Sequence, residues 1–259
     1  MTVVTIGEVD ALLYDVCRLL ILPERKQAVV ADRLRSRLRM VDLVSNEVTT
    51  MPLTSTNDAP YSLAADTLDP GVFFVGTVTK ILRVKCDDLK VMMEKDRNFG
   101  EIHGIVCDPN GDLLFSVYSP RCIMHATRRT VDELGPICQL VGGGSGKTMR
   151  DGPFSAACLG VPSVLVASPH HAQLLYCIAY SPYEGAPMIR MIDRKESTLT
   201  SLWSLDPPTL DFHVQSICAV PASKSSTLDL LVATCATTKC IFIVRPSGKL
   251  HWPSIESVN

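Results

Sequence analysis

The chain has 259 residues and a mass of 28.3 kDa, and 46% of its residues are hydrophobic while 20% are charged. This balance excludes a disordered chain and allows a large buried core. The net charge of −2 excludes a global positive field that would attract nucleic acid or an anionic membrane.

The N-terminus shows no basic region followed by an apolar run, so we expect no secretory signal. The longest clean apolar runs, such as Leu19–Leu22, are too short to span a bilayer. The ten cysteines lie mostly in apolar, strand-like runs and form no C-x-x-C motif, which predicts buried reduced thiols. We therefore expect an intracellular, cytoplasmic protein without a disulfide framework and without membrane contact.

The first unit of the chain opens with an apolar run that only Arg18 interrupts, typical of a strand buried on both faces. Pro23–Lys26 follows as a turn. Leu38 and Met40 then alternate with charged residues, as in a half-exposed strand. The predicted strands are Val16–Leu22, Gln27–Asp32, Ser36–Leu43 and Glu47–Met51.

The next two units repeat this pattern of four short strands. Asp108–Asp112 predicts a turn, because proline presets φ and Asn-Gly tolerates positive φ. The strands of the second unit are Tyr61–Ala65, Val72–Val75, Lys80–Lys85 and Leu89–Met93. Those of the third unit are Ile102–Cys107, Leu113–Val117, Cys122–Ala126 and Ile137–Val141.

A glycine-rich segment, Gly142–Gly152, predicts a flexible link before the fourth unit. The strands of that unit are Pro162–Ala167, Gln173–Ala179, Met188–Asp193 and Thr198–Trp203. The strands of the fifth unit are Val214–Val220, Leu228–Thr234 and Cys240–Arg245, with Gly248–Trp252 as a final outer strand.

Repeated four-stranded units of about 40–65 residues, without an amphipathic helix, predict an all-β fold of the β-propeller type. One blade cannot bury both of its faces alone, so the blades must stack in a ring. We expect a single domain over residues 1–259, with units at approximately 16–56, 57–98, 99–141, 142–208 and 209–252.

Two of the five units resemble the NHL-repeat family of β-propellers. The segment VVADRLRSRLRMVDLVSNEVTTM is similar to the strand–loop–"R-I-R-x-I/V-D" pattern of that family, and MIRMID (Met188–Asp193) repeats RLRMVD (Arg37–Asp42). The stretch GGGSGKTMRDGPFSAACLGVPSVLVASP resembles the glycine-rich link of the family. The resemblance implies a propeller fold, and members of the family include scaffolds, RNA binders, protein binders and a few enzymes.

Blade number and ring closure follow less directly from the residues. The units number five, whereas members of the family usually have six blades, so the alternatives are a ring of six with one degenerate blade or an open chain that a partner completes. Thr2–Ile6 is a short strand without a partner in the first unit. We expect it to close the ring as the outer strand of the last blade, in which case Gly248–Trp252 is a tail and not the outer strand.

Three candidate sites for chemistry match their motifs poorly. A phosphate loop that ends at Thr148 would need glycine where the chain has Val141. A serine-hydrolase elbow around Ser145 would need glycine where the chain has Lys147. Both motifs also need a following helix, and none is expected here. His103, His213 and Asp66, at the ends of inner strands, are a thin ligand set for a metal in the central channel. We therefore expect no nucleotide and no cofactor.

Topology brings one set of loops to a single face, because the second–third loops of antiparallel blades all lie at the same end of the strands. These loops are Asp32–Arg37, Gly76–Lys80, Ser119–Arg121, Tyr180–Pro187 and Thr237–Lys239. Cations beside aromatic rings can pair with an acidic protein or stack on nucleic acid. The predicted partner-binding residues are Arg33, Arg35, Lys80, Tyr118, Arg121, Tyr183 and Lys239.

These observations favour a non-catalytic scaffold that presents propeller loops to a protein partner in a larger assembly. No residue set specifies a reaction, so we do not expect an enzyme. A hydrolase or lyase with a metal in the channel is the alternative from another class, and RNA binding is a variant of the scaffold interpretation.

Overall fold

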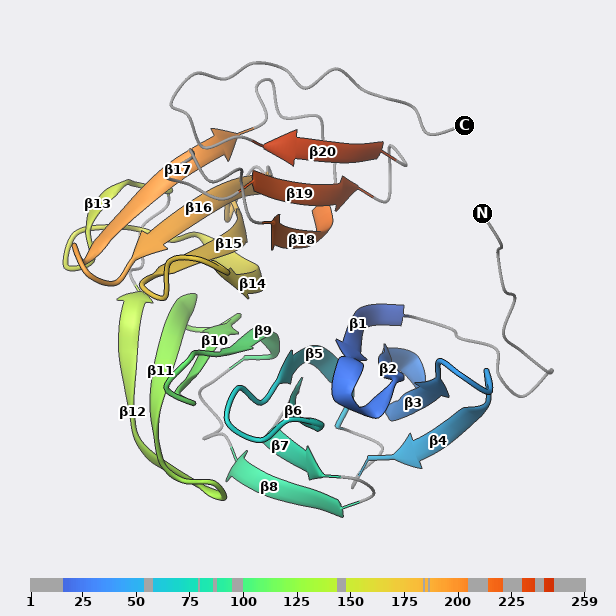
Figure 1. Cartoon of the computed structure of the whole chain (residues 1–259). Coiled ribbons are helices and arrows are strands. Elements are labelled where there is room, and N and C mark those ends of the chain that lie inside the picture. Colours follow the sequence, from blue (N-terminus) through green and yellow to red (C-terminus); the bar gives the residue numbers. More distant parts are fainter. Residues whose placement is uncertain are drawn as a thin grey trace.

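The computed structural model describes residues 16–53, 58–78, 80–85, 88–94, 100–143, 148–183, 185, 187–204, 214–220, 230–235 and 240–244. Within these residues the strands form five antiparallel sheets that follow one another along the chain (Figure 1). The prediction of an all-β fold is therefore confirmed, and three of the five sheets are four-stranded units as predicted. None of the helices in these residues is long and apolar enough to cross a membrane.

The first sheet is a meander in the order β1-β2-β3-β4. The turn between β1 and β2 is a short 3-10 helix, η2 (Pro23–Arg25), and a second one, η3 (Arg33–Arg35), joins β2 to β3. Each ends at a residue of left-handed conformation, Lys26 at φ +50° and Ser36 at φ +48°. The strands are β1 (Val16–Leu22), β2 (Gln27–Asp32), β3 (Arg37–Asp42) and β4 (Val48–Pro52).

The second and third sheets are also four-stranded meanders. The second contains β5 (Pro60–Ala65), β6 (Val72–Thr77), β7 (Lys80–Lys85) and β8 (Asp88–Glu94). The third contains β9 (Ile102–Cys107), β10 (Leu113–Val117), β11 (Cys122–Thr130) and β12 (Glu133–Gly142). The predicted Asn-Gly turn precedes β10, and Gly111 has φ +87° there, as expected.

The fourth sheet has a fifth strand at its outer edge, and the fifth sheet has three strands among the described residues. The fourth contains β13 (Gly152–Pro153), β14 (Val161–Ala167), β15 (Leu174–Tyr180), β16 (Pro187–Asp193) and β17 (Thr198–Ser204). The fifth contains β18 (Val214–Val220), β19 (Leu230–Cys235) and β20 (Cys240–Val244).

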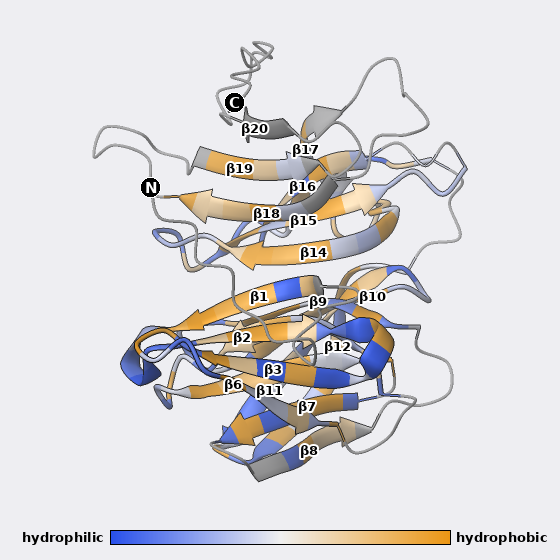
Figure 2. Ribbon diagram, turned by 90° about the vertical axis from the view of Figure 1, so that its right-hand side faces the viewer, coloured by the Kyte–Doolittle hydropathy of each residue, from blue (hydrophilic) through white to orange (hydrophobic). Residues whose placement is uncertain are grey.

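Neighbouring sheets pack face to face, and alternate residues of one strand enter different cores. In β6, Phe73 packs between the first and second sheets, and Phe74 packs between the second and third. In β14, Leu165 faces the third sheet and Val164 the fifth. Because strand side chains alternate in direction, a sheet covered on both faces needs apolar residues at every position. This accounts for the largely orange colour of β14 in Figure 2.

The first strands of the sheets lie side by side near the centre of the molecule, in the order β1, β5, β9, β14 and β18 (Figure 1). The close approach of β9 and β14 depends on Gly104. A Cβ atom there would lie 2.6 Å from the backbone nitrogen of Leu165 and 2.6 Å from the carbonyl oxygen of Ser163. Glycine at this position allows two neighbouring sheets to meet backbone to backbone.

Most predicted strand boundaries agree with the structure to within two residues, and the differences lie in the third and fourth units. The hairpin predicted as Cys122–Ala126 and Ile137–Val141 is longer, because β11 and β12 continue to Thr130 and back from Glu133. The predicted glycine-rich link contributes β13, which pairs with β17 and which the sequence did not indicate. Three predicted segments lie outside the described residues: Thr2–Ile6, Thr237–Lys239 and Gly248–Trp252.

The expectation of buried thiols holds for only part of the cysteines that the structure describes. Cys107, Cys122 and Cys177 are buried, and burial raises the pKa of Cys122 to about 11 and that of Cys177 to about 12. Cys138 and Cys218, however, are exposed: Cys138 lies in an exposed stretch of the outer strand β12, and Cys218 alternates with the buried Ile217 on β18. For these two the prediction of burial was wrong.

Candidate functional site

The two ends of the strands form two faces with different residues. Because consecutive strands are antiparallel, one end of each sheet holds the start of the first strand and the turn between the second and third strands. The opposite end holds the turn between the first and second strands and the turn between the third and fourth. Tyr61 is near the start of β5, and Asp66 directly follows the same strand. We describe the end with Tyr61 first and the end with Asp66 second.

A stack of four side chains marks the first end. The rings of Tyr61 and His103 are nearly parallel, with centroids 4.8 Å apart and an interplanar angle of 14°. Tyr118 continues the stack, with its centroid 5.8 Å from that of His103. On the other side, the guanidinium carbon of Arg33 lies 5.2 Å from the Tyr61 centroid. We call Arg33, Tyr61, His103 and Tyr118 the ladder, and this end of the strands the ladder face.

The ladder is assembled from neighbouring sheets by the positions of its residues in their strands. Tyr61 and His103 are the second residues of β5 and β9, which pack side by side. Tyr118 directly follows β10, and its N–H donates to the carbonyl oxygen of Glu101, at 3.1 Å. A Cβ atom at Gly100 would lie 2.7 Å from the backbone nitrogen of Ser119, so the missing side chain lets the two segments approach.

Arg18 connects the ladder to the first sheet. Its guanidinium donates to the carbonyl oxygens of Cys17, at 2.6 Å, and His103, at 3.2 Å. Burial lowers the pKa of Arg18, while the neighbouring Cys17 and Tyr180 raise it. Tyr180 ends β15 in the fourth sheet, so the environment of this one guanidinium includes three sheets. Arg18 thus links the first strand of the first sheet to the backbone of His103 in the ladder.

The imidazole of His103 is held in its neutral form. Burial lowers its pKa below the usual 6.5; Glu101, whose carboxylate lies 3.8 Å from Nε2, opposes this effect, and the positive charges of Arg18 and Arg33 add to it. A neutral imidazole is the form that stacks on Tyr61 at neutral pH without bringing a third positive charge next to two arginines.

The structure places the predicted partner-binding residues in different environments. Arg33 and Tyr118 belong to the ladder, and the Tyr118 side chain is 47% exposed. Arg35 is exposed in η3, beside Leu34, which is 68% exposed. Tyr183, after β15, is 67% exposed. These residues lie at the ladder face.

The other predicted residues have contacts within the molecule or are not described. The ammonium group of Lys80 lies 3.4 Å from the carboxylate of Asp58, which is 1% exposed. Arg121 has φ +66° in the turn before β11, and its carbonyl oxygen accepts a hydrogen bond from Gly143. Lys239 lies outside the described residues.

Sequence reasoning did not assign Arg18, Tyr61 and Glu101 to this face and considered His103 only as a metal ligand. A signal was nevertheless present. Arg18, Tyr61 and His103 all occur within the first three residues of the first strand of their sheets. Residues at that position converge when the first strands surround a common centre.

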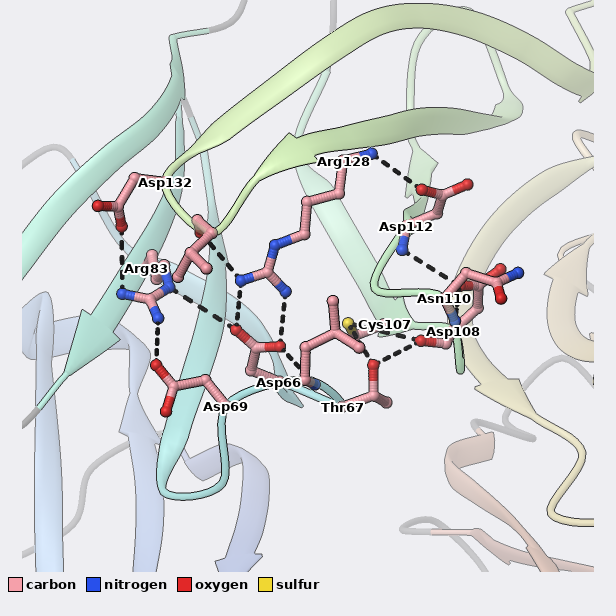
Figure 3. Close-up of polar contacts among 12 residues, drawn as sticks. Asp66, Thr67, Asp69, Arg83, Cys107, Asp108, Asn110, Asp112, Arg128 and Asp132 are labelled. Atoms are coloured by element: carbon pink, nitrogen blue, oxygen red, sulfur yellow. Dashed lines mark hydrogen bonds and ion pairs between the residues drawn. The ribbon is translucent and has the colours of Figure 1, made fainter.

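The second end of the strands carries buried ion pairs (Figure 3). Two nitrogens of Arg128, from the third sheet, donate to the two carboxylate oxygens of Asp66, from the second, at 2.6 and 2.8 Å. Arg83 lies 3.7 Å from the same carboxylate and also contacts Asp69 and Asp132. Burial raises the pKa of Asp66, but hydrogen bonds from Arg128 and Leu68 and the charges of both arginines outweigh it, so the net shift is downward.

The same arrangement recurs one sheet further along the chain. Asp108, at the end of β9, accepts from Arg194 of the fourth sheet at 2.9 Å. Both aspartates also cap the turn that follows them, through the backbone N–H groups of Leu68 and Asn110. We call Asp66–Arg128 and Asp108–Arg194 the clamps, and this end the clamp face. Each clamp joins a sheet to the next, so these charges have a structural role.

The arginines of the third strands also contact residues within their own sheets. Arg37 donates to Asp32 at 3.2 Å, and Arg190, which is fully buried, donates to Asp151 at 2.9 Å. Asp42 and Asp193, which end the related RLRMVD and MIRMID segments, cap equivalent turns through Oδ1. The two segments therefore have the same local structure.

Two of the three residues considered as ligands for a channel metal have other partners. His103 stacks on Tyr61 and lies at a tilt against Tyr118, and Asp66 is held by two arginines. His213 lies outside the described residues. Over the described ranges, no three His, Cys, Asp or Glu side chains are grouped as metal ligands would be.

Comparison with solved structures shows what the fold is similar to. An auxiliary nutrient binding protein from Bacteroides ovatus ATCC 8483 matches with a TM-score of 0.67 and 14% identity, covering 89% of this chain and 58% of that one. The corresponding protein from Bacteroides thetaiotaomicron VPI-5482 has a TM-score of 0.62 and 11% identity, over 92% of this chain and 56% of the other. A nidogen/laminin complex matches with a TM-score of 0.58 and 15% identity, over 84% and 74%.

These neighbours are β-propeller-like, and at such identities they show the fold alone. This chain spans less than two thirds of the length of either nutrient-binding chain. No family model matches the sequence, and no curated protein matches it.

Proposed function

We propose that this chain is a non-catalytic interaction scaffold whose ladder face docks a protein partner. The observation that carries the proposal is the ladder itself. Residues from three neighbouring sheets lie in one row: Tyr61 stacks on His103 at 4.8 Å, Tyr118 is tilted by 30° against His103 at 5.8 Å, and the guanidinium carbon of Arg33 lies 5.2 Å from the Tyr61 centroid. The exposed Leu34 directly follows Arg33. Tyrosine and arginine are the residues that most often dominate binding energy at protein interfaces.

The rigidity of this face supports a binding role. The ring of His103 contacts those of Tyr61 and Tyr118, and the backbone of Tyr118 is also fixed by its hydrogen bond to Glu101. η3 is closed by a hydrogen bond from the Ser36 N–H to the carbonyl oxygen of Arg33, at 3.1 Å. Side chains that are already ordered lose less conformational entropy when a partner binds.

We further propose that the repeats are of the NHL type and that the blades form a closed ring. The matching caps at Asp42 and Asp193 support a common repeat. Leu19 and Ile21 of β1, 62% and 46% exposed on the side of the first sheet away from the second, support a further blade of the ring beside them. A low-resolution solution envelope tests this proposal, since an open arc would contradict closure.

The binding proposal is tested by comparing what three versions of the full chain capture. Immobilised wild type, the double variant Leu34→Ala/Tyr118→Ala and the clamp-face control Lys26→Ala/Lys195→Ala are incubated with the same lysate, and captured proteins are quantified by mass spectrometry. We expect a set of proteins that the ladder variant loses and the control retains. Equal capture by all three versions would refute the ladder face as the docking site.

A further inference from the structure

The charged groups of the ladder face are unevenly exposed. Arg33 and Arg35 belong to η3, which projects from the strands, and Arg35 is exposed. The carboxylate next to this turn lies deeper: Asp32 has a fully buried side chain and accepts from Arg37. A molecule that approaches η3 therefore meets guanidinium groups before it meets the Asp32 carboxylate.

The sequence of η3 alternates charge and apolar surface. Leu34, 68% exposed, stands between Arg33 and Arg35, whereas the half-exposed Tyr118 lies at the other end of the ladder. An aliphatic side chain between two cations matches a segment that has an apolar side chain between two carboxylates. Charge-assisted hydrogen bonds between guanidinium and carboxylate are also among the strongest polar contacts that an interface can form.

The stacking within the ladder disfavours nucleic acid. Single-stranded RNA is bound largely by bases that stack on aromatic faces. The facing sides of Tyr61 and His103 cover each other, and the outer side of Tyr61 carries Arg33. A carboxylate that reaches the guanidinium groups of η3 needs no uncovered aromatic face.

We propose that the ladder face binds an acidic segment of its protein partner, with carboxylates at Arg33 and Arg35 and an apolar side chain against Leu34. This proposal rests on the proposed docking function and adds the chemistry of the partner. Opposite charges at such a rim speed association and make binding dependent on salt.

The experiment uses a displayed library of short random peptides selected on the intact chain. We expect the selected peptides to be rich in Asp and Glu around a Leu, Phe or Tyr. For a synthetic peptide of that kind, measured by fluorescence anisotropy, replacing its acids with Asn and Gln should weaken binding by about tenfold or more, as should a rise in salt.

Matched variants locate the contact. Arg33→Glu/Arg35→Glu should lose the acidic peptide and gain affinity for a version with Lys in place of its acids, while Lys26→Glu/Lys195→Glu, with the same change of charge on the clamp face, should bind as the wild type does. Circular dichroism and a melting curve check that both variants fold.

The outcomes separate the two proposals. If the ladder variant loses captured proteins but the selected peptides carry no excess of acids, the acidic partner is refuted and the docking function stands. If neither peptides nor proteins depend on the ladder face, both fail. Tighter binding of a single-stranded oligouridine than of any selected peptide would overturn the acidic segment in favour of RNA.

Discussion

The ladder face and the clamp face both contain arginines, but the two faces use them differently. At the clamp face, Arg128 forms a two-point contact with Asp66, whose side chain is fully buried, and the pair joins two sheets. At the ladder face, Arg33 lies over the ring of Tyr61, in a turn whose next residue is a largely exposed leucine. The number of positive charges does not distinguish these two roles. The groups that surround each guanidinium distinguish them.

The largest expected effect is a loss of stability when a carboxylate is removed from a clamp. Asp66→Ala leaves Arg128 and Arg83 buried without their shared anion, so we expect a loss of about 3–5 kcal/mol in the free energy of unfolding. Urea denaturation measures it. Asp132→Ala, at a side chain 49% exposed, is the control and should cost less than about 1 kcal/mol. A loss for Asp66→Ala as small as that of the control would contradict the clamp.

At the ladder face the largest effect should fall on binding. Tyr118→Ala removes a half-exposed ring at the end of the stack, so we expect about a 30-fold loss of affinity for the partner, in the range of an interface hot spot. Stability should change by less than about 1 kcal/mol, because the ring is partly solvated. Titration calorimetry and thermal unfolding check the two quantities, and a large loss of stability with intact binding would reverse the assignment.

Lys80 tests whether a cation at the ladder face contributes to stability or to partner binding. Its contact with the buried Asp58 predicts that Lys80→Met costs about 1 kcal/mol of stability. The same variant should leave partner affinity within about twofold of wild type, since its ammonium group points to a residue of its own chain. Chemical denaturation and a binding titration are measured on one preparation. Weaker binding at unchanged stability would return Lys80 to the docking surface.

The smallest expected effect is a change in the pH dependence of stability at the ladder. Because the pKa of His103 is lowered in the folded chain, the unfolded chain binds the proton first as the pH falls below about 6.5. Stability should therefore decrease on acidification, and His103→Gln should make that decrease shallower. Melting temperatures between about pH 7 and pH 5 test it. Identical slopes in the variant and wild type would show that His103 does not contribute.

Local patterns were enough to predict most of the strands. Val16–Leu22, Gln27–Asp32 and Lys80–Lys85 match their observed bounds because apolar runs end at clear turn residues. β13 was missed because two residues, Gly152 and Pro153, show no period, and their pairing with β17 comes from contacts about 50 residues along the chain. The length of the β11–β12 hairpin was missed because Thr127–Glu133 is polar and resembles a loop.

The candidate site was partly predictable for the same reason. Topology alone places Arg33, Arg35, Tyr118 and Tyr183 at one end of the strands. It does not show that Lys80 meets Asp58, because that pairing joins a turn to the link before β5.

The sequence by itself therefore determined the all-β repeat, the order of the strands and the end of each sheet at which a loop lies, since these depend on period and turn chemistry. Only the tertiary structure decided which side chains meet. The stack of Tyr61 on His103 and the clamps between Asp66 and Arg128 join residues about 40 and 60 positions apart. Such contacts depend on how neighbouring sheets approach, and no local pattern encodes that distance.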